Sequence, residues 1–448
     1  MTWTSGPLPR AIACLALAAI VHASAPPPDT LRTGLALFVL IGGLWLTQAL
    51  HLSVTALLVP LLAVLTGLMD LRTALAPFAH PIIFLFLGGF TLAAALQRHG
   101  LDSLLARSVL RLAAGRRSTA VALLFGLTAL LSMWISNTAT AAMMLPLALG
   151  LLQDDDGPPE RAFVLLGVAY SASIGGIGTL VGSPPNAIAA AQAGIGFADW
   201  MRIGVPLVLV LLPLMVAVLF LLLRPGLGGR QQPCEEAAPA LPWTGAQRTT
   251  LAVFGLTAAG WIGAAPLGRA LGITADIDAA IALAAITALV ASGAIGWPDI
   301  ERRTQWGVLL LFGGGLALSE VMGVSGASRF LAGALTNALQ GAPPLLLLLG
   351  VVAFVVFLTE LVSNTASAAL LVPIFLGVAL SLQLPPPLLA AAIAVSASCA
   401  FMLPVATPPN AIVYATGQVP QATMLRCGLV LNLVCIVVIT LLASVVLG

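Results

Sequence analysis

The chain has 448 residues, of which 60% are hydrophobic and only 8% are charged, and its mean hydropathy is +1.09. Soluble domains carry about 25% charged residues, so this composition excludes a soluble protein and predicts an integral membrane protein. The net charge of +2 comes with 18 arginines and no lysine, and nothing in it indicates nucleic-acid binding. The cysteines show no metal-ligand spacing, which argues against a metal centre built on thiolates.

Apolar runs long enough to cross a membrane recur along the whole chain and predict one polytopic domain, all α-helical. The first apolar run, 11–25, could be either a retained membrane helix or a signal peptide. Arg10 precedes it and Ala23-Ser24-Ala25 resembles a cleavage site, so a cleaved signal peptide is the alternative to the retained helix that we favour. Further spans are predicted at 34–50, 53–69 and 81–97. The Arg-rich stretch 98–117 predicts an amphipathic helix on the cytoplasmic surface.

Two segments that are too long for a simple span follow. As one helix, 119–150 would measure roughly 48 Å against a hydrocarbon core of about 30 Å, and Ser136-Asn137-Thr138 lies near its middle. We therefore predict a re-entrant hairpin with this motif at its tip. Segment 162–195 contains Pro184-Pro185, which predicts a discontinuous helix with its unwound centre at Gly182 to Asn186. A span at 203–223 completes the first half.

The second half repeats this order after a predicted cytoplasmic linker at 224–248. The sequence SNTATAAMMLP recurs as SNTASAALLVP, with Ser363-Asn364-Thr365 at its start, and GSPPNAIA recurs as ATPPNAIV. The predicted elements are spans at 249–265, 278–295 and 306–322, a surface stretch at 325–340, a hairpin at 343–378, a broken helix at 386–420 and a last span at 428–447. The total is about 11 spanning helices. Each half, 26–223 and 249–448, has an odd number of crossings, which predicts an inverted repeat.

The arginines predict the orientation of the chain in the membrane. With a cytoplasmic N-terminus, 13 arginines lie on the cytoplasmic side and five outside, as the positive-inside rule requires. The outer five are Arg32, Arg72, Arg202, Arg269 and Arg329. We therefore predict a multi-pass protein of the inner (plasma) membrane with its N-terminus in the cytoplasm.

The paired polar motifs predict a binding site at the membrane midplane. Broken helices expose carbonyl oxygens that suit Na⁺, and half-helix N-termini suit a carboxylate or sulfate. Asparagine offers both an acceptor and two donors, so it can contact a cation and an anion together. Neither motif window contains Arg or Lys, so helix ends and bound cations would have to neutralise the anion. The alternative is that these polar residues only hold helices together. That role does not explain why two different motifs each occur twice at similar spacing.

With these motifs the chain resembles the divalent anion/sodium symporter family over about residues 34 to 447. The resemblance implies one Na⁺ between the first hairpin and first broken helix, and a second Na⁺ in the second half. These sites map to Ser132, Ser136, Asn137 and Gly182, and to Thr359, Ser363, Asn364 and Ala406. The anion would be held by Asn137, Thr138, Ser183, Asn364, Thr365 and Thr407, with Pro408 close by. The resemblance further implies a homodimer, an elevator-like movement of the site, and no cofactor beyond Na⁺ as coupling ion.

The combined prediction is a transporter that couples Na⁺ entry to uptake of a divalent anion. The substrates that we favour are C4-dicarboxylates (succinate, fumarate, malate), followed by tricarboxylates and sulfate. The rivals are a sodium-independent dicarboxylate exchanger, an anion channel, and an enzyme, which the lack of a nucleophile–base pair disfavours. Glu320 and Glu360 are carboxylates in apolar segments. Each could have a functional role or could form a hydrogen bond that joins helices, and the sequence does not decide between these roles.

Overall fold

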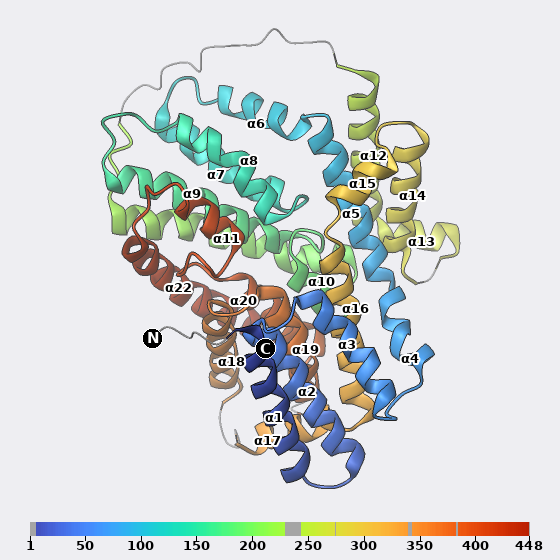
Figure 1. Cartoon of the computed structure of the whole chain (residues 1–448). Helices are drawn as coiled ribbons and strands as arrows, with labels where there is room; N and C mark the ends of the chain where they lie inside the picture. The colour runs from blue at the N-terminus through green and yellow to red at the C-terminus, as the bar shows by residue number, and fades with distance from the viewer. Residues whose placement is uncertain (1–5, 229–242, 274, 339–342, 382–383, 448) are drawn as a thin grey trace.

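The computed structural model describes residues 6–447 except 229–242, 274, 339–342 and 382–383. Within these ranges every regular element is a helix (Figure 1). The first elements are α1 (Pro7–Ser24), α2 (Asp29–Thr47), α3 (Leu52–Leu65), α4 (Leu71–Leu75), the 3-10 turn η1 (Ala76–Ala79), α5 (Pro81–Arg98) and α6 (Leu101–Arg111). The four predicted spans correspond to α1, α2, α3 and α5, and α6 occupies the predicted Arg-rich stretch.

Both long segments with the Ser-Asn-Thr motif form helical hairpins, as predicted. The first consists of α7 (Arg117–Ser132) and α8 (Asn137–Gly150), and the second of α18 (Pro344–Thr359) and α19 (Asn364–Ser381). Each asparagine is the first residue of the returning helix. At the first tip the Ser136 side chain caps α8 by accepting a hydrogen bond from the Ala139 N–H, so the motif itself makes the turn.

Both segments with a Pro-Pro pair form broken helices, but the unwound centre of the first lies earlier than predicted. The first consists of α9 (Pro158–Gly175), η2 (Gly176–Gly178) and α10 (Pro184–Ala193), and the second of α20 (Pro386–Ser398) and α21 (Pro408–Tyr414). Pro184 to Asn186 are therefore helical, and residues 179–183 are unwound. Proline needs no intrahelical N–H partner in a first turn, so the Pro-Pro pairs begin the second half-helices instead of interrupting a helix.

The remaining helices are α11 (Phe197–Leu223), α12 (Gly245–Ile262), α13 (Ala264–Leu271), α14 (Ile277–Ala291), α15 (Trp297–Arg303), α16 (Trp306–Val324), α17 (Ala327–Ala338) and α22 (Gln421–Leu447). The predicted span 249–265 ends in a bend of 87° between α12 and α13. Neither α13 nor α15 was predicted. Residues 229–242 of the predicted linker lie outside the described residues.

Among the described helices, seven are long and apolar enough to cross a membrane, or eight if α12 and α13 form one bent span. Adding the shorter helices α3 and α14 and the broken helix α20–α21 gives the predicted number of about 11. Helix α9 lies at the centre: every residue from Ala162 to Gly175 is buried, and α9 packs against α7, α8, α11 and α21.

The two halves of the chain pack crosswise around this centre. Helix α10, from the first broken helix, packs against α19 and α20 of the second half. Helix α21, from the second broken helix, packs against α8 and α9 of the first half. The Tyr170 hydroxyl of α9 also donates to the Phe401 carbonyl in the second unwound segment at 2.8 Å. Each hairpin therefore meets the broken helix of the other half, which brings both motif tips to one place.

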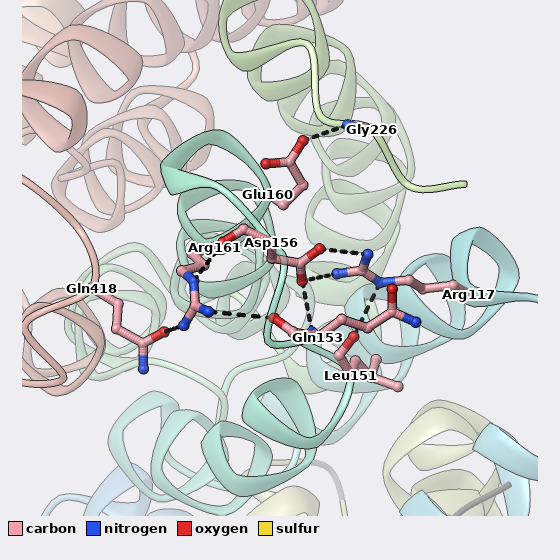
Figure 2. Close-up of polar contacts among 8 residues, drawn as sticks. All are labelled: Arg117, Leu151, Gln153, Asp156, Glu160, Arg161, Gly226 and Gln418. Carbon is pink, nitrogen blue, oxygen red and sulfur yellow. Dashed lines mark hydrogen bonds and ion pairs between the residues drawn. The ribbon is translucent and has the colours of Figure 1, made fainter. Parts of the chain in front are cut away.

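A polar network holds the base of the first hairpin (Figure 2). Arg117, whose side chain is 1% exposed, forms an ion pair with Asp156 and donates to the Leu151 carbonyl at 3.1 Å. Arg161 of α9 donates to the Asp156 carbonyl at 3.0 Å and to Gln418, beyond α21, at 2.8 Å. The network thus joins the start of α7, the loop after α8, the start of α9 and the segment after α21.

Candidate functional site

The two hairpin tips and the two unwound segments line one cavity of about 620 Å³. Most residues predicted to bind Na⁺ or the anion are in its wall. These are Ser136, Asn137, Thr138, Gly182, Ser183, Ser363, Asn364, Thr365, Ala406, Thr407 and Pro408. The other two, Ser132 and Thr359, are fully buried behind the tips. The structure therefore brings the sequence-predicted residues of both halves together.

Four oxygen atoms converge behind the first tip. The Ser132 hydroxyl lies 2.7 Å from Asn137 Oδ1 and donates to the Ala172 carbonyl at 2.6 Å. The Asn137 side-chain amide is also 3.1 Å from the Ala172 carbonyl and 3.2 Å from the Gly182 carbonyl. We call these atoms, from Ser132, Asn137, Ala172 and Gly182, the first oxygen cluster.

The Asn137 amide can take two orientations in this cluster, and hydrogen bonding within the protein alone favours the one with Nδ2 inward. With Oδ1 inward, oxygens alone face one another, which is the ligand set that a hard cation prefers. With the amide turned over, its nitrogen donates to Ser132 Oγ and to both carbonyls. A cation would stabilise the first orientation, and its absence would favour the second.

The second tip repeats this arrangement. The Thr359 hydroxyl lies 2.7 Å from Asn364 Oδ1 and donates to the Ala397 carbonyl at 2.9 Å. These atoms, from Thr359, Asn364 and Ala397, form the second oxygen cluster. The hydroxyl four residues before each motif serine thus contacts the motif asparagine and a carbonyl of the adjacent broken helix in both halves.

Close approach of the first broken helix to its tip depends on glycine. A Cβ atom on Gly176 would lie 2.3 Å from Asn137 Oδ1, and one on Gly182 would lie 2.6 Å from the Gly176 carbonyl oxygen. The latter neighbour is backbone and cannot move aside as a side chain would. These glycines therefore keep the cluster compact.

The asparagines of the two PPN motifs have a different role from those of the tips. Asn186 donates from Nδ2 to the carbonyls of Gly176 and Thr179 at 2.8 and 2.7 Å. Asn410 donates to those of Ala400 and Leu403, both at 3.1 Å. Both side chains are fully buried. They satisfy carbonyls of the unwound backbone and hold its shape, whereas the residues before each Pro-Pro pair reach the cavity.

Glu360 anchors the second unwound segment through hydrogen bonds, which is one of the two roles that the sequence left open for it. Its carboxylate accepts hydrogen bonds from the backbone N–H groups of Phe401, Met402 and Leu403 at 2.7, 2.9 and 3.1 Å. Asn432 of α22 donates a fourth at 2.8 Å. In the first half, the Met133 carbonyl instead accepts from Thr179, whose hydroxyl accepts from the Gly182 N–H. A carboxylate thus organises one unwound segment, and neutral groups organise the other.

Replacing Glu360 by glutamine is expected to lower the free energy of unfolding by about 2–3 kcal/mol, because the charge is lost and one backbone N–H would face the new amide N–H₂. The measurement is the thermal unfolding midpoint of the purified protein in detergent. The control is Glu320→Gln on α16, since Glu320 is exposed and the substitution is the same. Equal midpoints for the two variants would contradict the anchoring role.

Sequence reasoning missed a charged residue in the cavity wall. Arg10 of α1 lines the cavity together with Gln48 and Gln305. The inference that only helix ends and bound cations neutralise an anion here is therefore incomplete. No local pattern in the sequence could have shown that Arg10 lines the cavity. Arg10 lies far from both motifs in the sequence, and a basic residue next to an apolar run is ordinary at the end of a membrane helix.

Comparison with known proteins identifies the family of the chain. A sequence model of the citrate transporter family matches residues 43–395, which include both hairpins and the first broken helix. The chain belongs to this family of membrane transporters. The predicted resemblance to divalent anion/sodium symporters, and the prediction of a transporter rather than an enzyme, are confirmed.

Relatives of this citrate transporter family member align along nearly the whole chain. An uncharacterized transporter of Haemophilus influenzae is 50% identical, covering 91% of this chain and 90% of that protein. The sodium-dependent dicarboxylate transporter SdcS of Staphylococcus saprophyticus is 34% identical, covering 91% and 84%. The crystal structure of the YdaH transporter of Alcanivorax borkumensis matches with a TM-score of 0.57 at 19% identity, covering 85% and 90%. That last likeness concerns the fold alone.

Proposed function

We propose that this transporter couples Na⁺ entry to the uptake of a divalent anion, most favourably a C4-dicarboxylate. The observation that carries the proposal is the repeated oxygen cluster: two tips with matching geometry meet at one cavity that also presents amide and hydroxyl donors. The similarity to a relative named as a sodium-dependent dicarboxylate transporter supports it.

In this proposal each oxygen cluster holds one Na⁺. Ser132, Asn137 and Gly182 of the first cluster hold the first ion together with Ser136 of the cavity wall. Thr359 and Asn364 of the second cluster hold the second ion together with Ser363 and Ala406 of the wall. An ion in the first cluster fixes Asn137 with Oδ1 inward, which leaves its Nδ2 group free to donate to an anion. The N-terminal ends of α8 and α19 add partial positive charge beside the cavity. Cation binding therefore prepares the site for the anion, which is the physical basis of coupling.

The anion lies between the tips, against Thr138, Ser183, Thr365 and Thr407 as well as the two asparagines. The halves 26–223 and 249–448 form an inverted repeat joined by a cytoplasmic linker, and the N-terminus is cytoplasmic. Two protomers associate, and the site crosses the membrane by an elevator-like movement. The crosswise packing supports this part of the proposal, because it joins both hairpins and both broken helices into one body.

The test is uptake of labelled succinate into liposomes that contain the purified protein. Accumulation that requires an inward Na⁺ gradient is the expected result. Uptake that needs only internal dicarboxylate, with or without Na⁺, would instead identify an exchanger. Equilibration without accumulation under any gradient would indicate a channel. Labelled citrate and sulfate in parallel vesicles test the tricarboxylate and sulfate alternatives, and uptake of one of them in place of succinate would overturn the dicarboxylate assignment.

A further inference from the structure

Arg10 is the one charged side chain among the cavity-lining residues in the described part of the chain. It lies in the first turn of α1 and is partly exposed. Its guanidinium donates to the Thr47 carbonyl at 3.4 Å, and no ion pair joins it to a carboxylate of the described residues. A guanidinium has five N–H donors, so this one long bond leaves most of them available to the cavity.

The position of Arg10 places it at the mouth of the cavity. Arg10 contacts Thr47, which together with Gln48 ends α2, and the cavity wall also includes Gln305, which precedes α16. The motif tips lie at the turns of hairpins that enter the protein interior. An anion that moves between the tips and the solution next to these helix ends would pass the guanidinium.

We propose that Arg10 attracts a carboxylate group of the anion at this mouth, on the face of the membrane that bears the N-terminus. The inference rests on the proposed function and adds a recognition residue from outside both motifs. Guanidinium groups bind carboxylates through paired N–H donors, and a cationic cleft wall raises the local concentration of an anion.

Because of the packing of α1, Arg10 attracts the anion at only one face of the membrane. Helix α1 packs chiefly against α2, beside it at one edge of the molecule (Figure 1), whereas the tips belong to helices packed around α9, α10 and α20. When the body that carries the tips moves across the membrane, Arg10 stays behind. The anion therefore meets Arg10 only while the site faces the N-terminal side.

The test is Arg10→Gln, with the KM for labelled succinate measured separately at each face in right-side-out and inside-out vesicles. Removal of an N-terminal tag by added protease reports the orientation of each preparation. We expect the KM at the N-terminal face to rise about three- to tenfold at low salt, and less at high salt, because one charge acts across a solvent-filled cavity. The KM at the opposite face should not change.

Two variants and one further measurement complete the design. Arg10→Lys keeps the charge and should stay within about twofold of the wild type. Arg107→Gln removes a charge from the exposed face of α6, outside the cavity, and should leave both KM values unchanged. If Arg10→Gln does not fold, the salt dependence of the wild-type KM tests the same charge, since it should be steeper at the N-terminal face.

An unchanged KM at the N-terminal face, an equal shift at both faces, or a wild-type salt dependence that is the same at both faces would each overturn the role of Arg10 while leaving the transport proposal intact. Failure of the proposed function gives a different result, because wild-type vesicles would then carry none of succinate, citrate and sulfate in either orientation. In that case both the proposed transport function and the inference about Arg10 would be wrong.

Discussion

Replacing Asn137 or Asn364 by alanine is expected to lower Na⁺-driven succinate uptake by at least about 100-fold. Each asparagine contributes one oxygen to a cluster and one amide to the cavity, and losing two such polar contacts costs on the order of 3 kcal/mol. The measurement is the initial rate of uptake into proteoliposomes at a fixed Na⁺ gradient. Asn337→Ala on α17, an exposed asparagine that does not line the cavity, is the matched control.

An aspartate at position 137 separates the two tasks of the amide. It keeps oxygen atoms for a cation but has no N–H₂ group for an anion and adds a negative charge. Asn137→Asp should therefore retain stabilisation of the protein by Na⁺, measured as a shift in the thermal unfolding midpoint, while losing succinate uptake. Retained uptake in either alanine variant would remove these residues from the proposed site.

Replacing Arg117 by methionine is expected to lower the free energy of unfolding by about 3–5 kcal/mol, because Asp156 would keep a charge without its partner at a site that is 5% exposed. Thermal unfolding in detergent is the measurement. The neighbouring Arg116 is exposed, so Arg116→Met makes the same substitution without breaking the network and should have little effect. A double variant, Arg117→Met with Asp156→Leu, should recover part of the loss.

The same pair predicts a pH dependence. Burial alone would raise the pKa of Asp156, but hydrogen bonds from Arg117 and the Gln153 N–H, and the charges of Arg117 and Arg161, outweigh it and lower the pKa below its ordinary value. The unfolded chain then binds the proton more readily than the folded protein. The stabilisation is therefore complete above about pH 5 and is lost as the pH falls through the lowered folded pKa, below about pH 4. The difference between Arg117→Met and the wild type should shrink in that range, and a constant difference would contradict this account.

The sequence predicted the hairpins and broken helices because their signals are local. A polar tripeptide in the middle of an apolar segment too long for one span leaves few alternatives to a turn at Ser136 and Ser363. The position of the first unwound centre was wrong for an equally local reason. Pro184-Pro185 was read as an interruption, but proline is favoured in a first turn, and the chain unwinds on the N-terminal side of the pair.

The parts of the site that were not predicted depend on tertiary contacts. Glu360 acquires its role from backbone N–H groups about 40 residues later and from Asn432 of the last helix. Arg10 enters the cavity wall through the packing of α1 on α2. Neither partnership leaves a periodic or spaced pattern in the sequence, so hydropathy and motif reasoning could not find them.

The crosswise packing of α10 and α21 sets an order on biogenesis. The ribosome delivers α7 to α11 to the membrane well before α19, α20 and α21 exist, yet α10 packs on α19 and α20, and α8 packs on α21. The first hairpin tip is therefore synthesised early, but its packing is completed only after the second broken helix has been inserted. A chain that is released before α21 lacks the contact between α21 and α8, so premature termination before α21 leaves the site incomplete even where both hairpins have been made.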